Sequence, residues 1–235
     1  MTGIVLFGYG QMGHQIESFI DARDDMELYQ VYDFGQLIKE NTETKFDRYV
    51  VVDFSHFKMH NMAINYALSH KCAIVCGTTG LEAEQIEHLR EASSEIPVMY
   101  STNYSYGVVI LKKIVAEACR YLGEWDIELI EAHHNKKQDA PSGTAKTLLD
   151  IIGRENRVYG REGQCPRQPG EIGVHAVRGG TEAGMHTVQF WGDNELIEIR
   201  HHAQSRRIFA NGAVIAAGLI PDEPGYYSFE DILDR

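Results

Sequence analysis

The stretch that most constrains the fold is residues 8–13, Gly-Tyr-Gly-Gln-Met-Gly, which follows an apolar run ending at Phe7. In a Gly-x-Gly-x-x-Gly turn between a strand and a helix, the first glycine permits a tight turn and the second lets a pyrophosphate approach the backbone. The third lets the helix pack on the strand. A second strand-like run ends in Asp33, twenty residues after Gly13, where a carboxylate can bind ribose hydroxyls. We therefore predict a dinucleotide site formed by Gly8, Tyr9, Gly10, Gln11, Met12, Gly13 and Asp33. The alternative is a glycine-rich turn in another kind of α/β protein.

Asp33 also bears on which dinucleotide is bound. A carboxylate accepts hydrogen bonds from a free 2′-hydroxyl and repels a 2′-phosphate. The residues that follow are Phe34, Gly35 and Gln36, and the nearest cation is Lys39. We therefore expect NADH to be preferred over NADPH.

The next part of the chain alternates buried strands with helical patterns. Strands are predicted at 49–54, 73–76 and 97–100, and helices at 59–69 and 82–93. This alternation is typical of α/β proteins with a doubly wound parallel sheet, in which ligands lie outside the carboxyl ends of the strands. Gly77, Thr78 and Thr79 are therefore expected to contact the nicotinamide half of the cofactor. A plain turn that caps the next helix is the alternative.

The pattern changes after a helix expected over residues 108–122. Strand-like runs with alternating polarity, joined by glycine-rich turns, predict a mixed or antiparallel sheet over 126–132, 174–178, 186–191 and 196–201. Residues 154–172 resemble a long loop, whereas 209–219 are again helical and apolar. We therefore expect two domains, residues 1–105 completed by 208–235, and residues 106–207.

A basic cluster, His133, His134, Lys136 and Lys137, follows the first strand of the second domain. The net charge of −12 argues against nucleic acid as a partner, so a local cluster of cations indicates an anion site. The alternative is a solvated run of charges. Neighbouring side chains on a strand point to opposite faces, so we do not expect His133 and His134 to share a metal ion, and we predict no metal site.

A helix start follows the basic cluster. Pro141 suits a first helical turn capped by Asp139 or Ser142. Ser142, Gly143 and Thr144 would offer backbone N–H groups and hydroxyls at the positive end of that helix, which favours a carboxylate ligand. Since His and Lys can transfer protons, these features indicate the nicotinamide-dependent reduction of a small carboxylate-bearing compound with a C=N or C=C bond.

The run Glu131-Ala-His-His134, followed by Lys137 and by Asp139-Ala-Pro-Ser-Gly-Thr-Ala145, resembles the signature of bacterial 4-hydroxy-tetrahydrodipicolinate reductases, the dihydrodipicolinate reductase family. The resemblance covers nearly the whole chain, including residues 8–13, 52–54, 77–80, 103–105 and 209–213. It implies a Rossmann-type N-terminal domain and a second α+β domain. It also implies that NAD(P)H reduces 4-hydroxy-2,3,4,5-tetrahydrodipicolinate, a step of lysine and diaminopimelate biosynthesis, in a homotetramer built through the second-domain sheets.

The same resemblance implies roles for individual residues. His133 would donate or accept a proton and Lys137 would donate one. The substrate carboxylates would be bound by His134, Lys137, Ser142, Gly143 and Thr144. The dinucleotide would be lined by residues 8–13, Asp33, Gly77, Thr78, Thr79, Ser101, Thr102, Asn103 and Tyr104. The chain differs from the family pattern at two positions: Phe34 stands where the family often has Arg, and His56 stands where the family often has another basic residue. Both differences favour NADH.

The chain lacks an apolar run of about 18 residues and a signal-type start, so we expect a soluble cytoplasmic protein without membrane contact. Cys72 and Cys76 are expected to be packed thiols, and no disulfides are expected. Two other functions stay open. One is an amino-acid dehydrogenase of similar build, which would lack the Ser-Gly-Thr site. The other is a dinucleotide sensor, which would need a partner-binding module.

Overall fold

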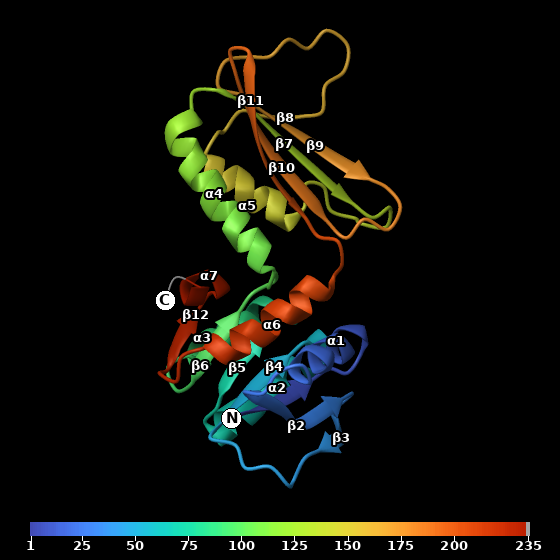
Figure 1. Cartoon of the computed structure of the whole chain (residues 1–235), viewed down its shortest axis with the longest axis vertical. Helices are drawn as coiled ribbons and strands as arrows, with labels where there is room; N and C mark the ends of the chain where they lie inside the picture. Colours follow the sequence, from blue (N-terminus) through green and yellow to red (C-terminus); the bar gives the residue numbers. More distant parts are fainter. Residues whose placement is uncertain (234–235) are drawn as a thin grey trace. The chain divides into compact units, whose positions relative to one another are not determined.

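The computed structural model describes residues 1–233 and divides into two compact units (Figure 1). The first unit contains Met1–Ser105 and the segment that begins at Arg207, and the second contains Tyr106–Arg206. The strands of the first unit are β1 (Thr2–Phe7), β2 (Met26–Asp33), β3 (Gln36–Glu40), β4 (Arg48–Asp53), β5 (Ala73–Cys76), β6 (Pro97–Tyr100) and β12 (Gly225–Tyr227). Its helices are α1 (Gln11–Ile20), η1 (Phe57–Met59), α2 (His60–His70), α3 (Ala83–Ala92), α6 (Arg207–Leu219) and α7 (Phe229–Leu233).

The first sheet has the strand order β12-β6-β5-β4-β1-β2-β3. All neighbouring pairs are parallel except β2 and β3. The chain runs from β1 outward to β2, then returns to β4 on the other side of β1, so the strand order reverses between β1 and β4. A ligand of such a sheet binds in the crevice at this reversal. The predicted doubly wound parallel sheet is confirmed.

Both faces of this sheet are covered, which explains its continuous apolar strands. Val5, Val51 and Ile74 belong to one core cluster with α2 and α3 residues such as Ile64 and Leu89. Because side chains alternate along a strand, the residues between them face the opposite side. On that side α6 packs against β4 and β5, and α1 packs against α6.

The sequence did not predict β3. No strand is predicted between Asp33 and residue 49, but Gln36–Glu40 pairs antiparallel with β2 at the edge of the sheet. All five residues of β3 are exposed, so neither face shows the apolar alternation by which strands are recognised.

The second unit is a mixed sheet with the order β11-β10-β7-β9-β8. Its strands are β7 (Asp126–His133), β8 (Arg157–Tyr159), β9 (Ile172–Arg178), β10 (Met185–Gly192) and β11 (Glu195–His202), and its helices are α4 (Tyr106–Leu122) and α5 (Gly143–Ile152). Figure 1 shows α4 and α5 along one face of this sheet. Leu111, Leu148, Leu129 and Phe190 lie in the core between the helices and the sheet. The prediction of an α+β unit with a mixed sheet is confirmed.

Two local expectations for this unit were wrong. The segment 154–172 is not only a loop, because it contains β8, which pairs in parallel with β9. Pro141 does not lie in the first turn of α5, because that helix begins at Gly143 and Ser142 is its N-cap. The Ser142 hydroxyl accepts from the backbone N–H of Ala145, which leaves Pro141 outside the helix.

Candidate active site

The segments predicted to line the dinucleotide lie together at the carboxyl edge of the first sheet. Backbone hydrogen bonds connect the residue after each strand to a neighbouring strand. Gly8 N–H donates to Tyr32, Phe54 to Phe7, Gly77 to Asp53 and Ser101 to Cys76, with N···O distances of 2.8–3.1 Å. Four loops from distant parts of the sequence thus follow β1, β4, β5 and β6 along one edge.

The three glycines of the turn meet three different requirements. Gly8 has a φ of +95°, and a Cβ there would lie 2.5 Å from the carbonyl oxygen of Phe54. A Cβ on Gly13 would collide with the carbonyl oxygen of Gly8, whereas one on Gly10 would meet nothing within 4 Å. Gly8 and Gly13 are therefore required by the fold, and Gly10 leaves the open space that a phosphate approaching the start of α1 would need.

The acidic residue of the fingerprint lies beside this turn. Asp33 ends β2, and its Oδ1 accepts the backbone N–H of Tyr9 at 3.3 Å. Lys39 does not face Asp33 as a free cation, because its Nζ forms an ion pair with Glu17 at 2.6 Å and also contacts the Tyr9 hydroxyl. The cation nearest to Asp33 in the sequence is thus already neutralised by a carboxylate.

Two of the predicted cofactor residues direct their side chains into the core. Thr78 is buried and donates its hydroxyl to Asp53 at 2.9 Å, and Tyr104 is buried and donates to the carbonyl of Cys76 at 2.8 Å. Only their backbones are available to a ligand at this edge. In contrast, Thr79 and Thr102 are exposed.

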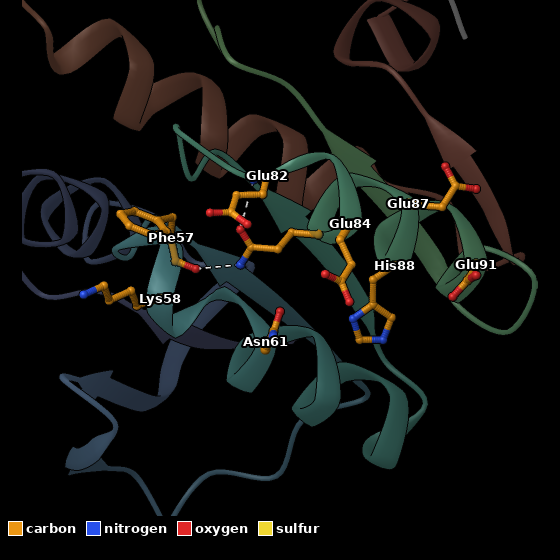
Figure 2. A pocket seen from close by; sticks show the side chains of 9 residues that line it. Phe57, Lys58, Asn61, Glu82, Glu84, Glu87, His88 and Glu91 are labelled. Carbon is orange, nitrogen blue, oxygen red and sulfur yellow. Dashed lines mark hydrogen bonds between the residues drawn. The ribbon is translucent and has the colours of Figure 1, made fainter.

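A separate hollow of about 650 Å³ lies between η1, α2 and α3 (Figure 2). It is lined by Phe57, Lys58, Asn61, Glu82, Glu84, Gln85, Glu87, His88 and Glu91. None of these is a predicted site residue, and four of them are glutamates that would repel a phosphate or carboxylate. This hollow is therefore not the anionic site.

In the second unit, the predicted proton-transfer residue His133 is the last residue of β7 and is buried. Its Nδ1 lies 2.8 Å from Oε2 of Glu131. Its Nε2 lies on the side of Gly184, where an added Cβ would be 3.2 Å away. Burial lowers the pKa of His133, the Glu131 carboxylate partly opposes this, and the charge of Lys137 lowers it further. The imidazole is therefore neutral near pH 7.

Glu131 connects three parts of the site from a fully buried position. Its Oε1 accepts the backbone N–H of Ser142 at 3.2 Å and a guanidinium N–H of Arg178 at 2.8 Å. Burial alone would raise the pKa of Glu131, but the hydrogen bonds from Arg178 and Ser142 outweigh it and lower that pKa. The carboxylate is thus held ionised between His133 and the start of α5.

His186, on the neighbouring strand β10, completes this buried group. Its Nε2 lies 3.0 Å from the Ser142 hydroxyl, and its ring packs edge-on against that of His133 at 5.2 Å. The Ser142 hydroxyl also caps Ala145, so it is engaged on two sides. At this helix start, Gly143 is the exposed residue, and a Cβ added there would meet nothing within 4 Å.

The two other predicted substrate residues lie on the loop that follows His133. Nδ1 of His134 accepts the backbone N–H of Lys136 at 3.2 Å, so the neutral imidazole carries its proton on Nε2. Nζ of Lys137 forms an ion pair with Asp139 at 2.8 Å, and Lys137 lowers the pKa of that carboxyl. Each therefore presents a donor that a carboxylate ligand could accept from.

Two buried groups could in principle hold a metal: Asp53, His60 and Cys76 in the first unit, and Glu131, His133 and His186 in the second. In each group, the carboxylate oxygen and the nearest imidazole nitrogen are only 2.7 or 2.8 Å apart. Two ligands of one tetrahedral zinc ion lie roughly 3.3 Å apart. Asp53 is engaged by hydrogen bonds on both carboxylate oxygens, so the first group is built as a protein network. Glu131 accepts hydrogen bonds on Oε1 only, and within residues 1–233 its Oε2 and Nδ1 of His133 lie in contact without a hydrogen bond.

Comparisons with known proteins match both parts of the chain. A family model described as "Dihydrodipicolinate reductase, N-terminus" matches residues 2–104, and one described as "Dihydrodipicolinate reductase, C-terminus" matches residues 107–233. The chain belongs to the dihydrodipicolinate reductase family. The resemblance predicted from the sequence is confirmed, and with it the enzyme class, an NAD(P)H-dependent oxidoreductase.

Two members of the dihydrodipicolinate reductase family match the chain over nearly its whole length. A 4-hydroxy-tetrahydrodipicolinate reductase from Caldanaerobacter subterraneus subsp. tengcongensis is 46% identical, and the match covers 100% of this chain and 99% of that protein. One from Methanosarcina mazei is 41% identical, with 99% of each covered. The solved structure of dipicolinate-bound dihydrodipicolinate reductase from Paenisporosarcina sp. TG-14 has the same fold, with a TM-score of 0.72, 23% identity and 99% of each chain covered. Across residues 1–233, no helix combines the length and apolar character that crossing a membrane requires.

The sequence argument did not assign roles to three residues around His133: Glu131, Arg178 and His186. Glu131 lies within the family motif, two residues before His133, so a strand places both side chains on the same face. His186 shares its face with the buried Val188 and Phe190, a polar residue in an apolar alternation. Arg178 could not be found this way, because the parallel pairing of β7 and β9 brings it to His133 across 45 positions in the sequence.

The buried His186 predicts a pH-dependent stability. Burial, followed by the charge of His133, lowers its pKa to about 4, whereas an unfolded imidazole titrates near 6.5. Between these values the unfolded chain binds a proton that the folded chain does not, so stability falls as pH drops through this window. We expect His186→Gln to remove about 2 kcal/mol of the loss in unfolding free energy between pH 7 and pH 5. Urea unfolding at both pH values measures this. The exposed His70→Gln serves as control, and equal pH dependence in all three proteins would contradict the prediction.

Proposed function

We propose that this chain reduces 4-hydroxy-2,3,4,5-tetrahydrodipicolinate to 2,3,4,5-tetrahydrodipicolinate, with loss of water, in lysine and diaminopimelate biosynthesis in the cytoplasm. Residues 1–105 with 208–235 bind the dinucleotide, and residues 106–207 bind the substrate. The observation that carries the proposal is the arrangement at the end of β7. A neutral buried imidazole, an ammonium group and the start of α5 follow one another within residues 133–144. The dipicolinate-bound relative supports a dicarboxylate as the ligand.

The substrate carboxylates bind to donors at the start of α5 and on the loop that precedes it. The start of α5 presents backbone N–H groups at Gly143 and Thr144, and His134 presents Nε2–H. Lys137 contributes an ammonium group whose partner Asp139 is half exposed and can be replaced by the ligand. Helix N-termini and charged donors stabilise bound carboxylates. Ser142 supports this site by capping α5.

The proton transfers use the neutral imidazole of His133 and the ammonium group of Lys137. The neutral His133 takes a proton from C3 as the 4-hydroxyl leaves, and Lys137 donates the proton that makes it water. NADH, when bound, supplies the hydride that enters at C4. His133 then returns its proton to C3, and solvent reprotonates Lys137. The sum is one substrate, one NADH and one proton converted to product, NAD⁺ and water.

An assay of NADH oxidation with substrate generated by the aldolase reaction tests the function. We expect substrate-dependent oxidation that pyridine-2,6-dicarboxylate inhibits, because that planar dicarboxylate resembles the ring being reduced. No oxidation with this substrate, together with activity on an amino acid, would instead favour an amino-acid dehydrogenase.

We further propose that NADH is preferred over NADPH. Asp33 faces the ribose side of the turn, Phe34 is 85% exposed, and Lys39 is paired with Glu17. A 2′-phosphate would therefore meet a carboxylate, and Lys39, the nearest cation in the sequence, is already paired. At least about 1 kcal/mol of repulsion is expected at a surface position, so kcat/KM should favour NADH on the order of tenfold. Asp33→Asn should narrow this ratio. A wild-type ratio that favours NADPH would contradict the proposal.

The open face of the second sheet supports a homotetramer. Trp191, Leu196 and Val177 are 46%, 41% and 52% exposed, and they lie on the side opposite the core residues Phe190 and Val174. Exposed apolar side chains on one sheet face are typical of interfaces between subunits. Light scattering that returns the mass of a single 26.5 kDa chain would contradict this part of the proposal.

A further inference from the structure

We infer that Asp53 is a positioning residue that locks the loops of the dinucleotide site to one another, with His60 fixing its carboxylate. The inference rests on the dinucleotide site proposed above. Asp53 is the last residue of β4, next to the point where the strand order reverses. Its side chain is fully buried and faces α2, so it does not itself contact a ligand at the sheet edge.

The Asp53 carboxylate gathers five donors. Oδ1 accepts the backbone N–H of Ser55 at 3.1 Å, the Ser55 hydroxyl at 2.6 Å and the Thr78 hydroxyl at 2.9 Å. Oδ2 lies 2.7 Å from Nδ1 of His60 and 3.6 Å from Sγ of Cys76. Burial, followed by the Asp53 carboxylate, raises the pKa of Cys76 well above its usual range, so the thiol keeps its proton and can donate it. A carboxylate buried in the core needs this number of donors, because burying polar oxygens without partners is costly.

Each oxygen serves a different purpose. Oδ1 ties Ser55, in the loop after β4, to Thr78, in the loop after β5. Oδ2 faces His60, the first residue of α2, whose side chain is fully buried. Nε2 of His60 has no hydrogen-bond partner within residues 1–233, so the buried ring is held at Nδ1, which contacts Asp53 at 2.7 Å and Sγ of Cys76 at 3.7 Å. His60 thus fixes the carboxylate plane, which in turn sets where Oδ1 points.

The loop after β4 then positions the glycine turn and the loop after β5. At Gly8, the space of a Cβ is filled by the Phe54 carbonyl oxygen and by Cα of Ser55, at 2.5 and 2.7 Å. At Gly77, the same space is filled by the Phe54 ring. A shift of Ser55 would therefore be transmitted to the pyrophosphate turn and to Gly77. Asp53 holds all three loops in register without contacting the dinucleotide.

Thr78→Val tests this inference with an almost isosteric change. The Thr78 hydroxyl is buried, donates to Asp53 and accepts the backbone N–H of Ser55 at 3.2 Å, so its loss can affect the dinucleotide only through the loops after β4 and β5. A hydrogen bond to a charged acceptor contributes about 1.5 kcal/mol, so we expect the Kd for NADH to rise roughly tenfold. The kcat at saturating NADH should change less than about twofold, because chemistry takes place on a complex that still forms. Thr187→Val, a buried threonine in the second unit, is the matched control and should leave the Kd unchanged.

Asp53→Asn separates positioning from packing. Its amide oxygen can still accept from Ser55 and Thr78, and its amide N–H can donate to Nδ1 of the other His60 tautomer. The Kd of Asp53→Asn should therefore stay near the wild-type value, well below that of Thr78→Val, with folding checked by thermal unfolding. An unchanged Kd in folded Thr78→Val would overturn the inference while leaving the proposed function intact. A wild-type chain that bound neither NADH nor NADPH would overturn both.

Discussion

Replacement of Lys137 with methionine is expected to lower kcat by about 10²- to 10⁴-fold, the range for the loss of a general acid. Methionine keeps the length and most of the volume of the side chain and removes only the charge and the N–H donors. Because Lys137 is partly exposed on a loop and its ion pair with Asp139 is half in solvent, folding should change by less than about 1 kcal/mol. The binding of NADH, which uses the first unit, should not change.

Steady-state kinetics with Lys136→Met as the control measure this effect. Lys136 is exposed and is one residue away, so its variant experiences the same loss of local positive charge. A comparable loss of kcat in both variants would indicate a general electrostatic role, and an unchanged kcat in Lys137→Met would remove Lys137 from the proton transfer. His133→Gln is expected to show a loss similar to that of Lys137→Met, because the two residues act in the same step.

Much of the first unit followed from local patterns. The spacing of Gly8, Gly10 and Gly13 relative to Asp33 predicted a strand, a turn and a helix, and the structure contains them as β1, the turn and α1. Buried parallel strands are continuous apolar runs, so β4, β5 and β6 were recognised to within one residue. The strand β3 was not, because an exposed edge strand needs no apolar alternation and is specified by its pairing with β2.

The candidate site was predictable only where its residues are close in sequence. His133, Lys137 and Ser142 stand in one motif and share one strand-to-helix connection. The groups that fix their chemical state come from elsewhere: Arg178 from β9 and His186 from β10. Strand pairing places them there, and no local pattern encodes which strands pair. Burial also changes the interpretation of Thr78. The sequence predicts that Thr78 contacts the cofactor, whereas in the fold its hydroxyl donates to Asp53.

Glu131 is the residue at which stability and activity are expected to be lost together. Glu131→Ala removes the acceptor from the Ser142 N–H, from Arg178 and from the neighbourhood of His133, all in a buried site. Removing one partner of a buried ion pair costs about 3 kcal/mol or more. Because the pKa of Glu131 is lowered in the folded chain, its contribution is present above the ordinary carboxyl pKa and is lost as pH falls through the folded value. The gap in unfolding free energy between wild type and variant should therefore narrow in acid.

Glu131→Gln distinguishes the charge of Glu131 from its shape. The amide keeps an oxygen for the Ser142 N–H, so the variant should fold, but it lacks the negative charge that raises the pKa of His133. We therefore expect the pKa of His133 to fall further, which moves the acid limb of the pH–kcat profile to lower pH, and kcat to drop by about tenfold or more as the imidazole becomes a weaker base. Glu198→Gln, on the exposed strand β11, is the control and should leave the profile in place. An acid limb that stays at the wild-type pH in Glu131→Gln would mean that the carboxylate holds the start of α5 without tuning His133, because only the charge differs between the two side chains.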